Sequence, residues 1–296
     1  MTLNSLDCYT LVTCPADHVR LVVANVTDTA RALERSHLCG PIAGLVQAEL
    51  IGGTVLLGTL LERPEQRISL RVAFPHGLLR GAVLEASYNG NIRGYVKQKV
   101  IPELDDDESL DDGMLFERAL GHEASCAIVT SEPPRPDERA LFNLNIPERL
   151  SITDIIEEYF NSSLQRNAFA QLSAASKGGY VECAHALLCE FLPEADSQLC
   201  DRLEPLFING TIQNALDGGA DIATIAQLMG LCTPQHMEVH PIRFACSCTA
   251  EHVLSMLRSL PVEEIQALIA ENKSADIFCH MCGKCYSITP EQLRTL

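Results

Sequence analysis

Basic residues are scarce in this chain of 296 residues. It contains 22 lysines and arginines against 39 aspartates and glutamates, which gives a formal net charge of −17. Nucleic acids and anionic membrane surfaces attract proteins through clustered basic side chains. The charge balance therefore argues against both, and we expect no nucleic-acid partner and no membrane partner.

Two sequence signals are also missing. Residues 1–7 have neither the basic segment nor the apolar run of a secretory signal. The chain has no Gly-x-x-x-x-Gly-Lys-Ser/Thr loop of the kind that cradles nucleotide phosphates. Thirteen cysteines without a signal peptide indicate a reducing compartment, where thiols bind metal or sense oxidants. We therefore expect a cytoplasmic protein.

One apolar stretch, residues 42–61, resembles a membrane span in length. It contains Gln47, Glu49 and three glycines, and polar sequence flanks it on both sides. A carboxylate near the centre of a bilayer span is costly. The stretch is therefore predicted to be a buried helix in the core of a globular domain.

The first two thirds of the chain indicate an α+β fold. Helices are predicted at 27–37 and 151–160, within a series of strands. The predicted strands cover residues 19–26, 67–74, 80–88, 92–96, 125–130, 139–146, 167–173 and 180–191. Strands that arrive in pairs with few helices between them favour an antiparallel sheet. We assign residues 1–192 to an N-terminal domain of antiparallel sheet and helix.

Residues 193–243 differ in character, because prolines and glycines divide them into short helical pieces. Short helices are marginal in water without tertiary packing. We predict a metastable, mainly helical linker whose apolar side chains pack against a neighbour; a plain helical subdomain is the alternative. The apolar side chains concerned are Leu203, Leu206, Phe207, Ile208, Leu228, Met229 and Leu231.

Four cysteines near the C-terminus form two close pairs. Cys246 and Cys248 make a C-x-C, and Cys279 and Cys282 make a C-x-x-C after the intervening residues 249–278. Two such pairs can complete the tetrahedron of thiolates that Zn²⁺ prefers. The spacing predicts a zinc site with one Zn²⁺ per chain and these four ligands.

Residues 244–296 are predicted to be a small zinc-binding domain. Thr249, Pro261 and Thr289 mark the starts of three short helices. The segment has few apolar anchors, so a bound metal must supply much of its stability. Structural zinc contributes on the order of 10–16 kcal/mol of apparent binding free energy in small modules.

Three other functions compete with a structural role for this zinc. A catalytic zinc normally keeps one position open for water, whereas four thiolates close the shell, so we expect no enzyme. A zinc ribbon that binds nucleic acid needs a basic stripe, and residues 244–296 carry only Arg258, Lys273, Lys284 and Arg294. A thiol oxidoreductase needs a C-x-x-C at a helix start in a βαβ unit, which is not evident. A zinc-ribbon interaction module and an oxidoreductase remain the alternatives.

The remaining cysteines outside the C-terminal domain have no ligand spacing among themselves. Free cysteine commonly behaves as a small buried apolar residue, and we predict that role here. The residues are Cys8, Cys14, Cys39, Cys126, Cys183, Cys189, Cys200 and Cys232.

The cysteine pattern, followed by Tyr286, resembles the zinc centre of the redox-regulated heat-shock chaperones, the heat shock protein 33 family. Three supporting segments resemble the same family: Arg93-Gly94-Tyr95-Val96 its hairpin motif, residues 158–163 its pair of aromatics before serine, and residues 178–188 its last N-terminal strand. Two features depart from the family pattern. Cys285 follows the second pair closely, and residues 103–112 are unusually acidic.

The resemblance implies an ATP-independent holdase that binds unfolding client proteins. Oxidation would join Cys246 to Cys248 and Cys279 to Cys282 as disulfides, release zinc and unfold the linker. A homodimer on oxidation is a further expected partner state. Cys285 is a candidate auxiliary thiol, either as a competing ligand or as a resolving thiol.

Overall fold

The computed structural model describes residues 6–105, 112–147, 150–258, 260–270 and 274–294. The strands are β1 (Cys8–Cys14), β2 (Val19–Asn25), β3 (Arg67–Ala73), β4 (Gly81–Ser87), β5 (Asn91–Val96), β6 (Glu123–Ser131), β7 (Glu138–Asn145), β8 (Ala168–Lys177), β9 (Tyr180–Phe191), β10 (Gln235–Pro241), β11 (Arg243–Phe244), β12 (Ala275–Phe278) and β13 (Cys285–Ile288). The helices are α1 (Thr27–His37), α2 (Pro41–Gly58), α3 (Pro102–Asp105), α4 (Asp112–Leu120), α5 (Ile152–Glu158), the π-helix η1 (Tyr159–Ser163), α6 (Ser197–Ile208), α7 (Thr211–Asp217), α8 (Ile222–Leu228), α9 (Ala250–Leu257), α10 (Val262–Ala270) and α11 (Pro290–Leu293).

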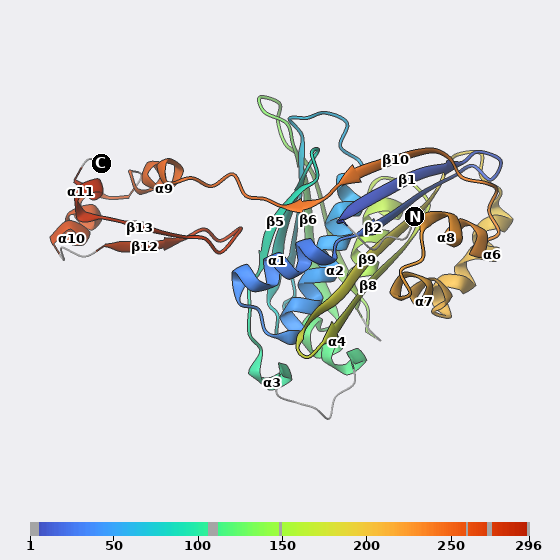
Figure 1. The fold of residues 1–296 in the computed structure, drawn as a ribbon, viewed down its shortest axis with the longest axis horizontal. Coiled ribbons are helices and arrows are strands. Elements are labelled where there is room, and N and C mark those ends of the chain that lie inside the picture. Colours follow the sequence, from blue (N-terminus) through green and yellow to red (C-terminus); the bar gives the residue numbers. More distant parts are fainter. Residues whose placement is uncertain (1–5, 106–111, 148–149, 259, 271–273, 295–296) are drawn as a thin grey trace.

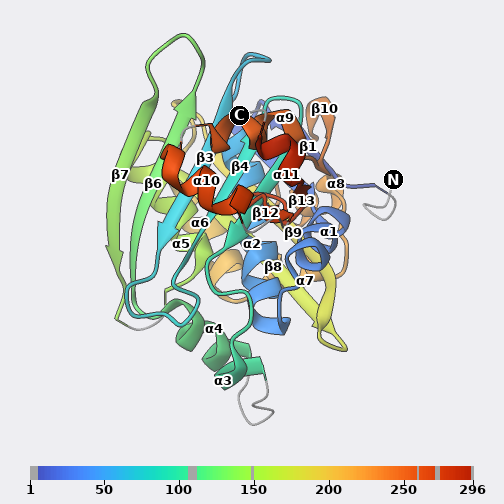
Figure 2. The same ribbon diagram turned by 90° about the vertical axis from the view of Figure 1, so that its left-hand side faces the viewer.

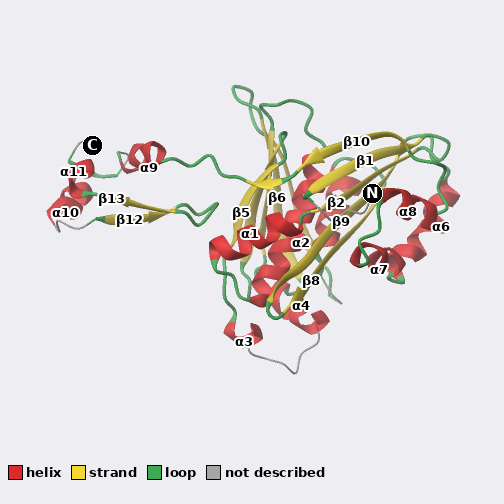
Figure 3. Ribbon diagram, in the orientation of Figure 1, coloured by secondary structure: helices red, strands yellow, loops and turns green. Residues whose placement is uncertain are grey.

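The strands form two large sheets and one small hairpin (Figures 1 and 3). A five-stranded sheet has the order β10-β1-β2-β9-β8, and a six-stranded sheet has the order β11-β5-β4-β3-β6-β7. Every described pairing is antiparallel except that of β11 with β5. The predicted α+β class with an antiparallel N-terminal domain is confirmed.

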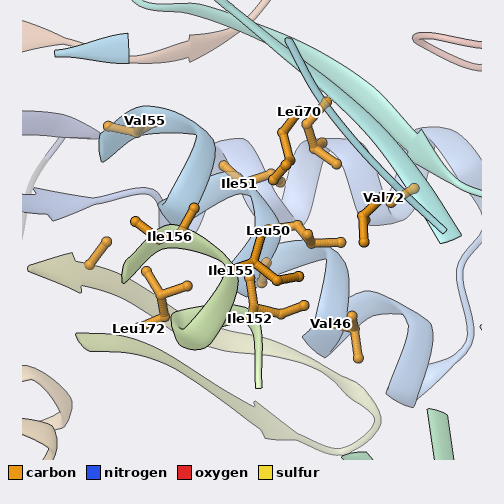
Figure 4. Packing of buried hydrophobic residues seen from close by; sticks show 14 of the residues in the cluster. Val46, Leu50, Ile51, Val55, Leu70, Val72, Ile152, Ile155, Ile156 and Leu172 are labelled. Atoms are coloured by element: carbon orange, nitrogen blue, oxygen red, sulfur yellow. The ribbon is translucent and has the colours of Figure 1, made fainter. Parts of the chain in front are cut away.

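Helix α2 is the centre of the main core. It packs against strands of both sheets, and Leu50, Ile51 and Leu56 are fully buried. Figure 4 shows α2 side chains between β3 on one side and α5 and β8 on the other. The helix is long and apolar enough to cross a membrane by composition alone, but 83% of its apolar window is buried in the molecule. The prediction of a buried core helix is confirmed.

The eight predicted strands all form, but three further strands of the large sheets, β1, β10 and β11, were not predicted. β1 carries partly buried residues without a clean alternation, and β10 is mostly exposed. β10 lies within the segment that was expected to be helical linker. β10 depends on pairing between positions far apart in sequence, such as Tyr9 with His240, whereas β1 also forms a hairpin with β2, the next strand in the chain.

Helices α6, α7 and α8 cover one face of the five-stranded sheet and bury a second apolar core (Figure 1, right). Leu203 and Met229 are buried there, and Leu206, Phe207 and Leu231 pack at its margin. The expected packing of the linker against a neighbour is therefore observed for these five side chains. Ile208 and Leu228 were expected to pack as well, but they face outward, with exposures of 78% and 42%.

The last part of the chain forms a small separate module that projects from the main body in Figure 1 and lies in front of it in Figure 2. The helices α9, α10 and α11 pack beside the β12–β13 hairpin around a core that includes Val253, Tyr286 and Leu293. Thr249 and Thr289 cap α9 and α11 through their side chains, as the sequence predicted. The hairpin itself was not predicted.

The acidic segment at 103–112 falls largely on residues 106–111, which lie outside the described residues. Its two described ends belong to helices, because α3 spans Pro102–Asp105 and α4 begins at Asp112. The carboxylate of Asp105 accepts hydrogen bonds from the backbone N–H groups of Ile42 and Ile101. At least this carboxylate therefore has a structural role at the start of α2.

Candidate metal centre

The C-x-C pair lies in the loop between β11 and α9. Pairing of β11 with β5 fixes the start of this loop, and the backbone N–H of Ala245 donates to the carbonyl oxygen of Ile92 at 3.0 Å. Thr249 ends the loop by capping α9. Cys246 and Cys248 are thus held between an anchored strand and an anchored helix start.

The C-x-x-C pair lies in the turn of the β12–β13 hairpin. The backbone N–H of Cys279 donates to the Lys284 carbonyl at 2.9 Å, and the N–H of Gly283 donates to the Cys279 carbonyl at 2.8 Å. Gly283 has a φ of 71°, a left-handed conformation that favours glycine. This turn aims both sulfurs to one side. A hairpin turn is also not the helix start that a thiol oxidoreductase uses.

The structure brings the four sulfurs together, all within 4.8 Å of one another. Cys246 Sγ lies 3.9 Å from Cys279 Sγ, and Cys248 Sγ lies 3.4 Å from Cys282 Sγ. A tetrahedral ion with metal–sulfur bonds of about 2.3 Å needs sulfur–sulfur separations of about 3.8 Å. The donor set and its spacing therefore fit a tetrahedral thiolate-binding metal ion.

Hydrogen bonding favours ionisation of one of these sulfurs. The Tyr286 hydroxyl lies 3.1 Å from Cys248 Sγ and 2.8 Å from the Cys248 carbonyl oxygen. Burial opposes ionisation, but the hydrogen bonds from Tyr286 and the neighbouring cysteines outweigh it and lower the pKa of Cys248 to about 7. Burial raises the pKa of Cys279 and of Cys282. These two sulfurs need a cation beside them to stay ionised at neutral pH.

An arginine of the N-terminal domain reaches the centre. Arg93 Nη1 lies 3.6 Å from Cys246 Sγ, and the same guanidinium binds Glu85 at 2.8 and 2.9 Å. Arg93 is about one fifth exposed, so its charge acts in a partly desolvated position. A guanidinium here stabilises negative charge on the sulfur. Glu85 holds it in place.

The hairpin turn also docks on the N-terminal domain through its backbone. The N–H of Gly94 donates to the Met281 carbonyl at 2.9 Å, and the Ser36 hydroxyl donates to the Cys282 carbonyl. A Cβ at Gly283 would lie 2.2 Å from the carbonyl oxygen of Ser36, so only glycine allows this approach. The rings of Tyr95 and His280 lie beside this contact, with centroids 5.9 Å apart.

The segment Arg93-Gly94-Tyr95 was singled out in the sequence only as a resemblance. The structure gives it a local role, because each of its three residues meets the module that carries the cysteines. The hydroxyl of Tyr286 was likewise not identified as a partner of Cys248. No periodicity or spacing signal could find these contacts, since they join segments that are distant in sequence.

The other candidate residues lie outside the four-sulfur group. Cys285 is exposed on β13, where alternation along the strand directs Tyr286 inward and Cys285 outward. Of the cysteines predicted to be buried, Cys14, Cys126 and Cys189 are buried and the other five are half-buried. Burial raises the pKa of Cys14 and of Cys126 to about 12, which makes both thiols poor nucleophiles at neutral pH.

Replacing one cysteine of the group tests the site. Loss of a residue that only orients a metal ligand typically weakens metal binding about 10–100-fold. We expect Cys279→Ser to weaken Zn²⁺ binding by more than this, because it removes one of the four thiolate ligands. Competition with a chelator measures the affinity. Cys285→Ser is the matched control and should bind as the unmodified protein does. Full zinc retention by Cys279→Ser would show that the ligand set is wrong.

The Tyr286 hydroxyl provides a second, subtler test. Tyr286→Phe keeps the ring in the module core and removes only the donor to Cys248, so we expect Zn²⁺ affinity to fall about 10–100-fold. Tyr180→Phe, at a tyrosine that is 67% exposed, is the control and should change nothing. Equal affinities of the two variants in the same chelator competition would exclude a role for the hydroxyl.

Comparisons with known proteins agree with this architecture. A family model described as Hsp33 protein matches residues 7–289. A protein of Thermus thermophilus named 33 kDa chaperonin is 30% identical over 299 aligned positions, covering 94% of this chain and 83% of the relative. A 33 kDa chaperonin of Deinococcus radiodurans is 26% identical, and the alignment covers 94% of this chain and 94% of the relative.

The fold also matches a solved structure. The 33 kDa chaperonin (heat shock protein 33 homolog) of Thermotoga maritima superposes with a TM-score of 0.86 and 17% sequence identity, covering 98% of this chain and 97% of that one. At this identity the likeness shows the fold alone. The family model, however, matches nearly the whole chain and includes all four cysteines of the centre. The chain therefore belongs to the Hsp33 family.

Proposed function

We propose that this protein is a redox-regulated, ATP-independent molecular chaperone, a holdase that binds unfolding client proteins. Membership of a family whose named relatives are chaperonins supports the chaperone role. The redox part rests on one observation: four cysteine sulfurs lie within 4.8 Å of one another and join a loop to a hairpin turn. Thiolates in such a cluster are both metal ligands and targets of oxidants.

In the reduced form, Cys246, Cys248, Cys279 and Cys282 would hold Zn²⁺. Zinc, when bound, supplies bonds that a small apolar core cannot replace. The core of the module contains five buried side chains within the described residues: Val253, Leu257, Tyr286, Ile288 and Leu293. The module therefore depends on its four sulfurs for its fold.

Oxidation would remove those ligands. A pair of thiolates gives up two electrons to one peroxide molecule, an S–S bond forms, and the peroxide takes up two protons and leaves as two waters. The expected products are the disulfides Cys246–Cys248 and Cys279–Cys282. In the reduced form sulfurs of opposite pairs also lie close together, Cys246 at 3.9 Å from Cys279 and Cys248 at 3.4 Å from Cys282. The pairing stays a prediction that disulfide mapping would decide.

The consequence for the linker follows from how the segments connect. Cys246 is separated from β10 only by the short β11, and β10 follows directly on the linker helices. When the loop is no longer tied to the hairpin, Arg93 loses its contact with Cys246 and the β11–β5 pairing loses its anchor. Unfolding of the module would then destabilise β10, which is close in sequence, and through β10 the helices α6, α7 and α8.

Unfolding of the linker would uncover apolar surface. The three helices cover sheet residues that are now fully buried, among them Val12, Leu21 and Leu187. They also contribute their own apolar side chains, such as Leu203 and Ile225. Both sets would become available to a client whose own apolar residues are exposed. We assign residues 1–192 to a stable domain, 193–243 to this linker and 244–296 to the switch.

Removal of metal under reducing conditions tests this division. We expect backbone amides of the C-terminal module to lose protection from hydrogen exchange, while those of α2, β3 and β9 stay protected. The reason is that α2 belongs to a large apolar core and the module does not. Simultaneous loss of protection throughout the chain would contradict three units of unequal stability.

Suppression of client aggregation tests the function. The reduced, zinc-loaded protein should hardly lower light scattering by a heat-unfolded client, because the linker covers its apolar surface. Peroxide with mild heat should release zinc and turn suppression on without ATP. Cys285→Ser, which leaves the four-sulfur group intact, is the control and should respond in the same way. Equal suppression by the reduced protein would remove redox control, and full activation with zinc retained would refute the mechanism. A homodimer of the oxidised form would be detected on the same samples by sedimentation.

A further inference from the structure

A second group of potential metal ligands lies on the six-stranded sheet, apart from the cysteine centre. It consists of His76 in the turn between β3 and β4, His122 directly before β6, and Glu123, the first residue of β6. Their ligand atoms all lie within 4.8 Å of one another. His76 Nε2 is 3.2 Å from one carboxylate oxygen of Glu123, and His122 Nε2 is 4.0 Å from the other.

The backbone brings the two histidines together by close contact of two turns. Each histidine adjoins a glycine, Gly77 and Gly121, that faces the other turn. A Cβ at Gly77 would lie 2.4 Å from the carbonyl oxygens of Ala119 and Leu120, and Gly121 has a φ of +72°. A side chain at either position would force the two turns apart.

Hydrogen bonds fix this arrangement. The N–H groups of Leu78 and Leu79 donate to the carbonyl oxygens of Arg118 and Ala119 at 3.1 and 3.0 Å. The turn that carries His76 is therefore bonded to the end of α4, from which the chain leads directly into His122. Main-chain hydrogen bonds between the two turns therefore keep the backbones of His76 and His122 close together, whatever the orientation of their side chains.

The carboxylate is oriented as well. Asn145 Nδ2 donates to Glu123 Oε1 at 3.3 Å, and the two residues are paired partners at the ends of β7 and β6. An amide donor on one carboxylate oxygen leaves the other oxygen directed at His76. Partners of this kind orient carboxylate ligands in metal sites.

We propose that His76, His122 and Glu123 form a second site, which binds a divalent transition-metal ion such as Zn²⁺, Ni²⁺ or Cu²⁺. Imidazole nitrogens with one carboxylate suit these ions. The two imidazole rings are parallel, 1° apart in orientation with centroids 5.0 Å apart. They must turn about their side-chain bonds to aim both nitrogens at one ion. Exposures of 55% and 51% leave them free to turn.

The chemistry of this site differs from that of the cysteine centre in two ways. It contains no thiol, so peroxide at the level that oxidises thiolates leaves its ligands intact. It also offers three protein ligands, which leaves coordination positions open for water or for a donor from another molecule. The oxidised protein should therefore still bind one metal ion per chain after the cysteines have lost theirs.

Metal titration of the full-length protein tests the proposal, with Ni²⁺ as the probe. Reduced protein already loaded with zinc should take up one further ion per chain by isothermal titration calorimetry, and peroxide-oxidised protein should also bind one. Because the reduced protein is included, the result does not depend on the proposed redox function. His76→Ala with His122→Ala should weaken this binding by at least about tenfold.

His236→Ala is the matched control, since His236 is an exposed histidine on β10 outside the group. It should bind Ni²⁺ as the unmodified protein does. The double variant replaces exposed side chains, and an unchanged Tm without added metal would show that it folds. Binding of the double variant at the affinity of the unmodified protein would overturn the proposal. So would the absence of a second ion in the unmodified protein at about 1 mM free Ni²⁺, a concentration that detects even weak sites.

Discussion

The C-terminal module is organised around four cysteine sulfurs that lie within 4.8 Å of one another. Thiolates crowded within 4.8 Å repel one another strongly unless positive charge lies between them. The chain itself places only one cation in contact with the group, the guanidinium of Arg93 on Cys246, as far as the described residues show. Under the function proposed above, the module would exist either as thiolates with a metal ion or as disulfides without one, and its fold would be compatible with the first.

The N-terminal domain is in direct contact with the cysteine turns of the module. Arg93, Gly94 and Ser36 contact residues within or beside the cysteine turns. The apolar face of the five-stranded sheet, in contrast, is covered by helices that join the module through β10 and β11. One segment thus connects the four cysteines with the helices that cover the apolar surface, and the proposed redox switch depends on this connection. Stability is distributed accordingly, with a large core around α2 and small cores toward the C-terminus.

Much of this organisation could be predicted from local sequence. The spacing of Cys246, Cys248, Cys279 and Cys282 predicted the four-sulfur group that the structure brings together, and the apolar run at 42–61 predicted the buried helix α2. The pairing of β1 with β10 could not be predicted, since neither strand has the alternation of a half-buried strand. Contacts such as Tyr286 with Cys248 and Arg93 with Cys246 depend on tertiary placement. Spacing along the chain shows which residues are close in sequence, but it does not show which residues distant in sequence are in contact.

The edge strand β10 affects whether folded molecules can associate with one another. It forms the outer edge of the five-stranded sheet, where unpaired main-chain groups invite other strands to add and aggregates to grow. β10 ends at Pro241, which has no N–H to offer, and it carries the charged Glu238 among exposed residues. Both features discourage such addition. The strand that shields β1 from solvent therefore also disfavours edge-to-edge association of folded molecules.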